Sequence, residues 1–316
     1  MKFMKLCTGM FCFCTVVLSV QAGSMREQSQ RIPLSVGIMP DADSLPFMVA
    51  RDEGLFTTEG VDVNLILFSN PQERDAALQA GNLDGSISDL LAAAFFAAGG
   101  FDFKVTSVTD GRYGIIVAPH SGINQLSELR GKQIALSRNT IIQYTVDALL
   151  QSAGVSFNEY EAVSVPRMPL RLEMVLNGQV SAASLPEPLL TAASAAGAAL
   201  LATTDTTGID AGILLFSQKT LDTRLSDVQK FYRAYYKAAQ KINADPHAYR
   251  DYLVEKAGFP QEVRNAYQFV YYREPQLPAI DQIEQALKWL ENYALLSHSL
   301  NPSDLIDGRA IAEWYY

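Results

Sequence analysis

Apolar runs alternate with amphipathic stretches along residues 34–216, and this order is typical of strands that alternate with helices. Residues 61–68, for example, alternate polar and apolar side chains before turning fully apolar, as a strand entering a covered sheet does. Strands joined by helices favour an α/β fold with largely parallel sheets flanked by helices. The pattern also predicts strands at 34–38, 103–109, 113–118, 132–136, 160–165, 199–203 and 211–216, and helices at 45–53, 126–130 and 140–153.

One motif occurs twice, at 70–89 and at 171–188. Each copy reads as a short helix, a glycine, a short strand and a polar turn, and an alanine-rich helix follows. An arginine lies seven residues before the glycine in both copies, Arg74 in the first and Arg171 in the second. A unit used twice, about a hundred residues apart, predicts two similar α/β lobes that face each other across a cleft.

The two lobes are expected to exchange chain segments. Strands 113–118 and 211–216 resemble each other, and we interpret them as the crossing segments between the lobes. The first lobe would then comprise residues 32–115 plus 212–316, and the second lobe residues 116–211.

The C-terminal third of the chain is predicted to be almost entirely helical. Phe231, Tyr232, Tyr235 and Tyr236 fall on one helical face, and this aromatic stripe is expected to pack against the first lobe. The helices of this tail are predicted at 224–243, 246–257, 260–271 and 279–294, with a last turn near 303–315.

The N-terminus has the pattern of an export signal. Lys2 and Lys5 precede an apolar stretch at 6–20, and small residues follow up to Ala22. The stretch is too short for a comfortable membrane span, and no lipoprotein cleavage motif is present. We therefore expect residues 1–22 to be a signal peptide cleaved near Ala22, which places the mature chain in the periplasm. All three cysteines lie inside this segment, so thiol catalysis and disulfides are excluded from the mature chain.

Charge narrows the possible partners. The 25 basic and 34 acidic side chains become 23 and 34 once Lys2 and Lys5 are removed, a formal charge of −11. No run of Lys or Arg remains to follow a phosphate backbone, so we expect no nucleic-acid partner. The sequence also gives no reason to expect a metal or a cofactor.

Four short motifs together carry a family resemblance. They are Pro-Phe-x-x-Ala-x-x-x-Gly-Leu-Phe-x-x-Glu-Gly at 46–60, Ala-Gly-x-x-Asp at 80–84, Leu-Ser-Glu-Leu-Arg-Gly-Lys at 126–132 and Pro-Glu-Pro at 186–188. Over residues 33 to about 245, the chain resembles the type II periplasmic solute-binding proteins of ABC importers. Within that class it is similar to the branch that serves alkanesulfonates, nitrate, taurine and thiamine-pyrimidine precursors.

The resemblance implies a two-lobed, Venus-flytrap fold and a role in import. Such a protein is a binder and not an enzyme; it delivers a small molecule to an ABC permease in the inner membrane, which works with its ATPase subunit. We expect a monomer. The sequence departs from the family pattern at two places, so the identity of the ligand cannot be taken from any one member. Pro186 stands where the family often has a tryptophan, and residues 137–140 replace a cluster of small residues.

Ligands of open α/β sheets sit outside the carboxyl ends of the strands, so the polar loops there supply the candidate binding residues. Their backbone N–H groups and hydroxyls would bind one polar end of a solute, and their carboxylates would accept its hydrogen-bond donors. Helix capping alone explains most of these residue types equally well, but Asp41 and Asp110 less easily. The candidates are Asp41, Asp43, Ser44, Ser88, Asp89, Asp110, Asn139, Thr140 and Glu187.

Acidic candidates around this cleft outnumber Arg112 and Arg138, the nearest basic ones. This balance favours a ligand rich in N–H donors, such as an aminopyrimidine-like heterocycle, over a sulfonate.

The alternative is an enzyme on the same fold, since a eukaryotic thiamine-pyrimidine synthase is similar to these binders. That chemistry would want histidine, and the chain has only His120, His247 and His298, each in the context of a surface residue. No catalytic or dinucleotide-binding motif is present.

Overall fold

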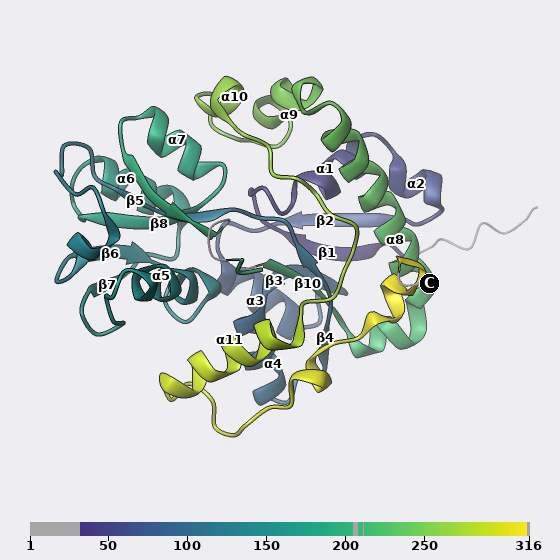
Figure 1. Cartoon of the computed structure of the whole chain (residues 1–316). Coiled ribbons are helices and arrows are strands. Elements are labelled where there is room, and N and C mark those ends of the chain that lie inside the picture. Colours follow the sequence, from purple (N-terminus) through teal and green to yellow (C-terminus); the bar gives the residue numbers. More distant parts are fainter. Residues whose placement is uncertain (1–31, 205–207, 211, 315–316) are drawn as a thin grey trace, which may run out of the picture. The chain divides into compact units, whose positions relative to one another are not determined.

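The computed structural model describes residues 32–204, 208–210 and 212–314, and these contain two five-stranded sheets (Figure 1). The predicted signal peptide at 1–22 lies outside the described residues. The first sheet has the strand order β2-β1-β3-β10-β4 and the second β7-β6-β8-β5-β9. The first contains β1 Leu34–Ile38, β2 Val63–Leu67, β3 Gly85–Asp89, β4 Phe103–Thr109 and β10 Gly212–Ser217, and the second contains β5 Tyr113–Val117, β6 Gln133–Leu136, β7 Glu161–Ser164, β8 Ala182–Pro186 and β9 Ala199–Thr203.

The two sheets share one topology. In the first, β1 runs parallel to β2 and β3, while β10 runs antiparallel to both β3 and β4. In the second, β6 runs parallel to β7 and β8, while β5 runs antiparallel to β8 and β9. Each sheet therefore has four strands in one direction and one returning strand. The predicted α/β class, the largely parallel sheets and the duplication are confirmed.

The returning strands are the predicted crossing segments. β5 directly follows β4 of the first sheet but pairs within the second sheet. β10 directly follows β9 of the second sheet but pairs within the first. The lobe boundary expected between residues 115 and 116 falls inside β5. The division into lobes at the predicted boundaries stays a prediction.

Helices cover both faces of each sheet. The apolar side chains of β1, together with Ile87, Leu214 and Phe216, face α1, α2 and α8, whereas Ile213 and Leu215 face α4 and α11 on the other side. In the second sheet, Ile116 and Leu185 pack against α6 and α7, and alternate residues pack against α5. The α-helices named here are α1 Leu45–Asp52, α2 Leu55–Glu59, α3 Pro71–Gln79, α4 Leu90–Ala98, α5 Ile141–Ser152, α6 Met168–Leu176, α7 Leu189–Ala195, α8 Gln218–Ala244 and α11 Ile280–Asn292.

The aromatic stripe of α8 packs as predicted. The ring of Phe231 stacks on those of Phe47 and Phe56, with centroids 5.1 and 5.3 Å apart, and Tyr235 stacks on Phe47 at 4.6 Å. These contacts hold α8 against α1 and α2, which lie beside it in Figure 1. None of the helices in the described ranges is long and apolar enough to cross a bilayer.

The predicted helix at 260–271 is wrong. Only α10, Val263–Ala266, is helical, and residues 267–279 continue without regular secondary structure. The side chain of Asn243 donates to the Tyr272 carbonyl at 2.7 Å and accepts from the Tyr272 N–H at 3.0 Å, which satisfies the backbone groups that a helix would need. Pro275 and Pro278 further exclude a helix in the residues that follow. The rest of the tail is α9 Arg250–Glu255 and the 3₁₀ turns Pro246–Tyr249, Pro302–Leu305 and Gly308–Trp314, and a further 3₁₀ turn, Leu126–Leu129, precedes β6.

A buried carboxylate fastens α11 to the second sheet. Asp147 of α5 is 7% exposed and accepts hydrogen bonds from Trp289 Nε1 at 2.8 Å and Tyr293 OH at 2.6 Å, both on or at the end of α11. It also accepts from Tyr160 OH at 2.8 Å. Because α11 packs against α4 as well, this helix touches elements of both sheets.

We expect Asp147→Ala to lower the free energy of unfolding by about 3 kcal/mol, because two buried donors, Tyr160 and Trp289, and the half-buried Tyr293 lose their acceptor. Urea unfolding followed by tryptophan fluorescence measures this change. Glu284→Ala, on the exposed face of α11, is the matched control and should leave stability unchanged. Equal stability of the two variants would contradict the assignment of Asp147 as the anchor of α11.

Candidate functional site

A cavity of about 40 Å³ lies where elements of the two sheets meet. The first sheet contributes the loop after β1, the end of β3 and the helix α3, and the second contributes β8 and the starts of α5 and α6. Carboxyl ends of parallel strands and helix N-termini thus converge on one space, the expected place for a ligand in this class of fold. The polar residues that line it are Asp41, Arg74, Ser88, Asp89, Thr140 and Arg171.

Four of the predicted residues are brought together here: Asp41, Ser88, Asp89 and Thr140. Two of them are also helix caps, as the alternative interpretation allowed. Asp89 Oδ1 accepts from Ala92 N–H at 2.9 Å at the start of α4, and Thr140 Oγ1 accepts from Ile142 N–H at 3.2 Å at the start of α5. Ser88 differs, because its buried Oγ has no hydrogen-bond partner among the described residues.

Asp41 is held by Ser44 in the loop before α1. Its Oδ1 accepts from the backbone N–H of Ser44 at 3.1 Å and from the Ser44 hydroxyl at 2.8 Å. Burial, and secondly the neighbouring Asp43, raises the pKa of Asp41 to about 8. This shift favours the protonated form of Asp41. Burial likewise raises the pKa of Asp89, although the positive charge of Arg74 opposes that shift.

Asp43 does not line the cavity but bonds to Tyr113, which does, and it lies beside both crossing segments. Its carboxylate accepts from Thr109 Oγ1 at 2.5 Å and from Tyr113 OH at 2.9 Å, which join the end of β4 to the start of β5. A side chain on Gly111 or on Gly212 would collide with the same carboxylate, so both crossing segments pass close to it. Burial raises the pKa of Asp43. These contacts make Asp43 a structural residue of the crossing.

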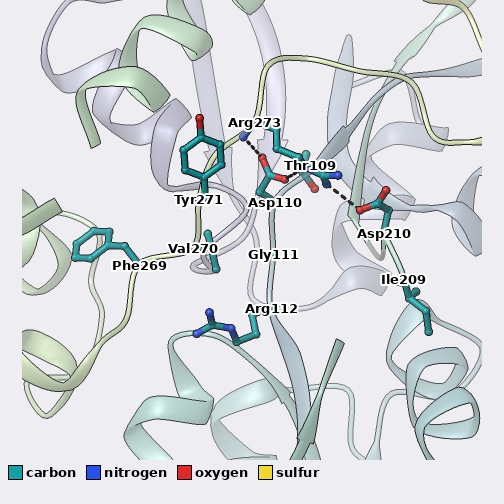
Figure 2. Close-up of a pocket in the computed structure, with 10 residues that line it drawn as sticks. All are labelled: Thr109, Asp110, Gly111, Arg112, Ile209, Asp210, Phe269, Val270, Tyr271 and Arg273. Carbon is teal, nitrogen blue, oxygen red and sulfur yellow. Dashed lines mark hydrogen bonds and ion pairs between the residues drawn. The ribbon is translucent and has the colours of Figure 1, made fainter. Parts of the chain in front are cut away.

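The other four predicted residues do not line the cavity. Ser44 bonds to Asp41 in the loop before α1. Asp110 lines a separate hollow of about 220 Å³, where Arg273 Nε donates to it at 2.5 Å and Arg273 Nη2 reaches Asp210 at 2.8 Å (Figure 2). Glu187 lies 3.7 Å from Arg112 and caps α7 through Thr191 N–H. Asn139 is exposed, and its N–H bonds to the side chain of Gln143 at 2.9 Å.

Two buried arginines were not among the predicted site residues. Arg74 of α3 is 4% exposed, and Arg171 of α6 is 1% exposed. The repeat gave the signal that could have found them, since both lie seven residues before the glycine of their copy. They are thus equivalent positions of the two halves, and they line the same cavity.

The comparisons with known proteins agree with this architecture. A family model described as NMT1/THI5-like matches residues 41–249. A curated relative, 4-amino-5-hydroxymethyl-2-methylpyrimidine phosphate synthase of Schizosaccharomyces pombe, is 25% identical over 123 residues, which are 38% of this chain. The match spans only 35% of the length of that relative.

Two solved structures show the fold. The alkanesulfonate-binding protein SsuA of Xanthomonas axonopodis pv. citri, bound to MOPS, is similar with a TM-score of 0.76 and 18% identity, over 88% of this chain and 98% of its own. The periplasmic nitrate-binding protein NrtA of Synechocystis PCC 6803 is similar with a TM-score of 0.75 and 12% identity, over 90% of this chain and 88% of its own. The chain therefore has the fold of the periplasmic binding proteins.

The raised pKa of Asp41 predicts a pH dependence of stability. The pKa is about 8 in the folded protein and 3.8 ordinarily, so the folded protein binds this proton more tightly than the unfolded chain does. The stabilisation is complete below about pH 4 and is lost as the pH rises through about 8. We expect Asp41→Asn, which keeps an acceptor for Ser44, to lose less stability than the unmodified protein between about pH 5 and pH 9.

Urea unfolding across this range is the measurement. Asp62→Asn, which changes an exposed carboxylate, should follow the unmodified protein. If all three proteins show the same slope of stability against pH, Asp41 is already ionised at neutral pH in the folded state.

Proposed function

The chain belongs to the NMT1/THI5-like family, and on that premise we propose that it is the extracytoplasmic solute-binding component of an ABC import system. It binds a small polar molecule between its two lobes and delivers it to a permease in the inner membrane, which works with an ATPase subunit. The signal-like N-terminus supports export to the periplasm with cleavage near Ala22, and we propose that the mature protein is a monomer.

One observation carries this proposal: both halves of the duplicated fold supply buried polar groups to one shared cavity. Ser88 Oγ and Arg171 Nε are buried and lack a hydrogen-bond partner among the described residues. Buried polar atoms are ordinarily hydrogen-bonded, so a bound ligand would supply the partners that these two atoms lack. A ligand that bonds to groups of both halves stabilises the closed arrangement over an open one. The closed form is then what the permease recognises.

The size of the cavity fits a closing receptor. A space of about 40 Å³ holds little more than a few water molecules, whereas pockets that bind drug-sized ligands measure roughly 300 Å³ or more. Entry of a solute therefore requires the two sheets to move apart. The crossing segments beside Asp43 are the natural place for that motion, because β5 and β10 are the strands that connect the halves.

An enzyme of the thiamine-pyrimidine-synthase type is the alternative, supported by the name of the curated relative. The histidines give it no support. None of His120, His247 and His298 lines the cavity, and among the described contacts His247 accepts from Arg250 and His298 meets Ser297. The residues that do line the cavity can bind and orient a polar molecule.

We expect native mass spectrometry of the freshly purified protein to show one small molecule bound per chain, unchanged on incubation. Ser88→Leu fills the cavity while leaving the Asp89 cap in place, so this variant should lose the molecule. Ser127→Leu, on an exposed turn, is the control that should keep it. Conversion of the molecule to a new product would favour the enzyme, and retention of the molecule by Ser88→Leu would remove the cavity as the binding site.

A further inference from the structure

The two arginines of the repeat differ in how their charge is balanced. Arg74 lies beside Asp75, with Nε donating to Asp75 Oδ1 at 2.8 Å, and it also feels the charge of Asp89. Arg171 has no such neighbour. Its described hydrogen bond runs from Nη1 to the carbonyl of Ser184 at 2.9 Å, and no carboxylate forms an ion pair with it among the described residues.

A buried cation without an anion is costly. Burial disfavours an isolated charge by several kcal/mol, which is the reason that buried charges in proteins are normally paired. The same burial lowers the pKa of Arg171 to about 9, with no opposing carboxylate. An apolar side chain at position 171 would therefore be more stable in the folded protein than the unpaired guanidinium of Arg171.

The unsatisfied atoms that line the cavity can all donate a hydrogen bond. They are Nε of Arg171, Nη2 of Arg74, which meets Asp75 without good hydrogen-bond geometry, and the hydroxyl of Ser88. A group that satisfies all three must present several acceptor oxygens. An oxyanion does so and also neutralises the unpaired guanidinium.

The carboxylates near the cavity are already engaged. Asp41 Oδ1 accepts from Ser44, and the raised pKa of Asp41 favours its protonated form. Asp43 is bonded to Thr109 and Tyr113. Asp89 caps α4 and accepts a further bond from the backbone N–H of Ile141, at the start of α5. Hydrogen bonds within the protein thus already use part of the acceptor capacity of these carboxylates, which leaves less of it for a ligand rich in N–H donors than the acidic sequence loops suggested.

We propose that Arg171 binds an anionic oxygen group of the ligand, with Arg74 and Ser88 completing the donor set, so that the solute is a small organic oxyanion. This inference rests on the proposed binding function. The other walls of the cavity include the apolar side chains of Met39, Ile87, Ile142 and Met168, which suit an apolar body attached to the anionic head. Carboxylates, sulfonates and phosphate monoesters share this chemistry.

The test uses matched four-carbon probes with the full-length mature protein. Butanoate, butanesulfonate and butyl phosphate are titrated beside butylamine and 1-butanol by calorimetry, and thermal unfolding is recorded with each. At least one anion should bind and raise Tm, and the amine and the alcohol should not. Arg171→Met should weaken that binding by roughly tenfold to a hundredfold, since a charge-assisted hydrogen bond is lost. Arg171→Lys should retain part of it.

Arg171→Met also has a readout that needs no ligand. Replacing an unpaired buried charge by an apolar side chain of similar length should raise the Tm of the free protein, whereas a structural arginine would lower it on replacement. Arg167→Met, which removes an exposed charge at the start of the same helix, is the control and should change neither Tm nor binding.

The outcomes separate this inference from the proposed function. Tighter binding of butylamine than of any anion, or unchanged anion binding in Arg171→Met, would overturn the oxyanion site. A co-purified molecule without an acidic group would do the same while leaving the protein a solute binder. If no probe binds, the test is made with a co-purified molecule that carries an acidic group. Loss of this molecule from Arg171→Met, with retention by Arg167→Met, supports the oxyanion site. Retention of the molecule by both variants overturns the site.

Discussion

Each sheet is completed by a strand that the other half of the chain supplies, and the rest of the structure depends on this exchange. β5 and β10 cannot pair as they do unless both crossing segments run close together, and the carboxylate of Asp43 lies where they meet. Only glycine fits beside that carboxylate at positions 111 and 212. The end of β3 and the starts of α5 and α6 line the shared cavity.

The duplicated architecture could be predicted because it is written in local pattern. A glycine, a short strand and a polar turn occur in the same order in both copies. The polar and apolar alternation that identifies each strand can likewise be recognised from neighbouring residues alone. The extended segment at 267–279 could not be predicted, because what replaces its helical hydrogen bonds is the side chain of Asn243, which lies 29 residues before Tyr272.

The candidate site was predicted in part. Strand ends and helix starts supplied Asp41, Ser88, Asp89 and Thr140, which line the cavity. The sequence indicated no structural partner for Asp110. In the structure Arg273, 163 residues later, donates a hydrogen bond to its carboxylate. The arginines show the opposite error: a charged residue in an amphipathic helix is ordinarily placed in solvent, and sequence alone does not reveal that Arg74 and Arg171 are almost fully buried. What a carboxylate or guanidinium can do for a ligand depends on partners that only the folded chain brings near.

The attachment of α11 has a mechanical consequence. A two-stranded crossing by itself is a simple pivot, but α11 packs on α4 of one half and is bonded through Trp289 and Tyr293 to Asp147 of the other. α11 is therefore a third connection between the two halves, in addition to β5 and β10. If the halves separate as proposed for ligand entry, α11 would have to slide over α4 or lose its bonds to α5, and it would thereby limit how far they open.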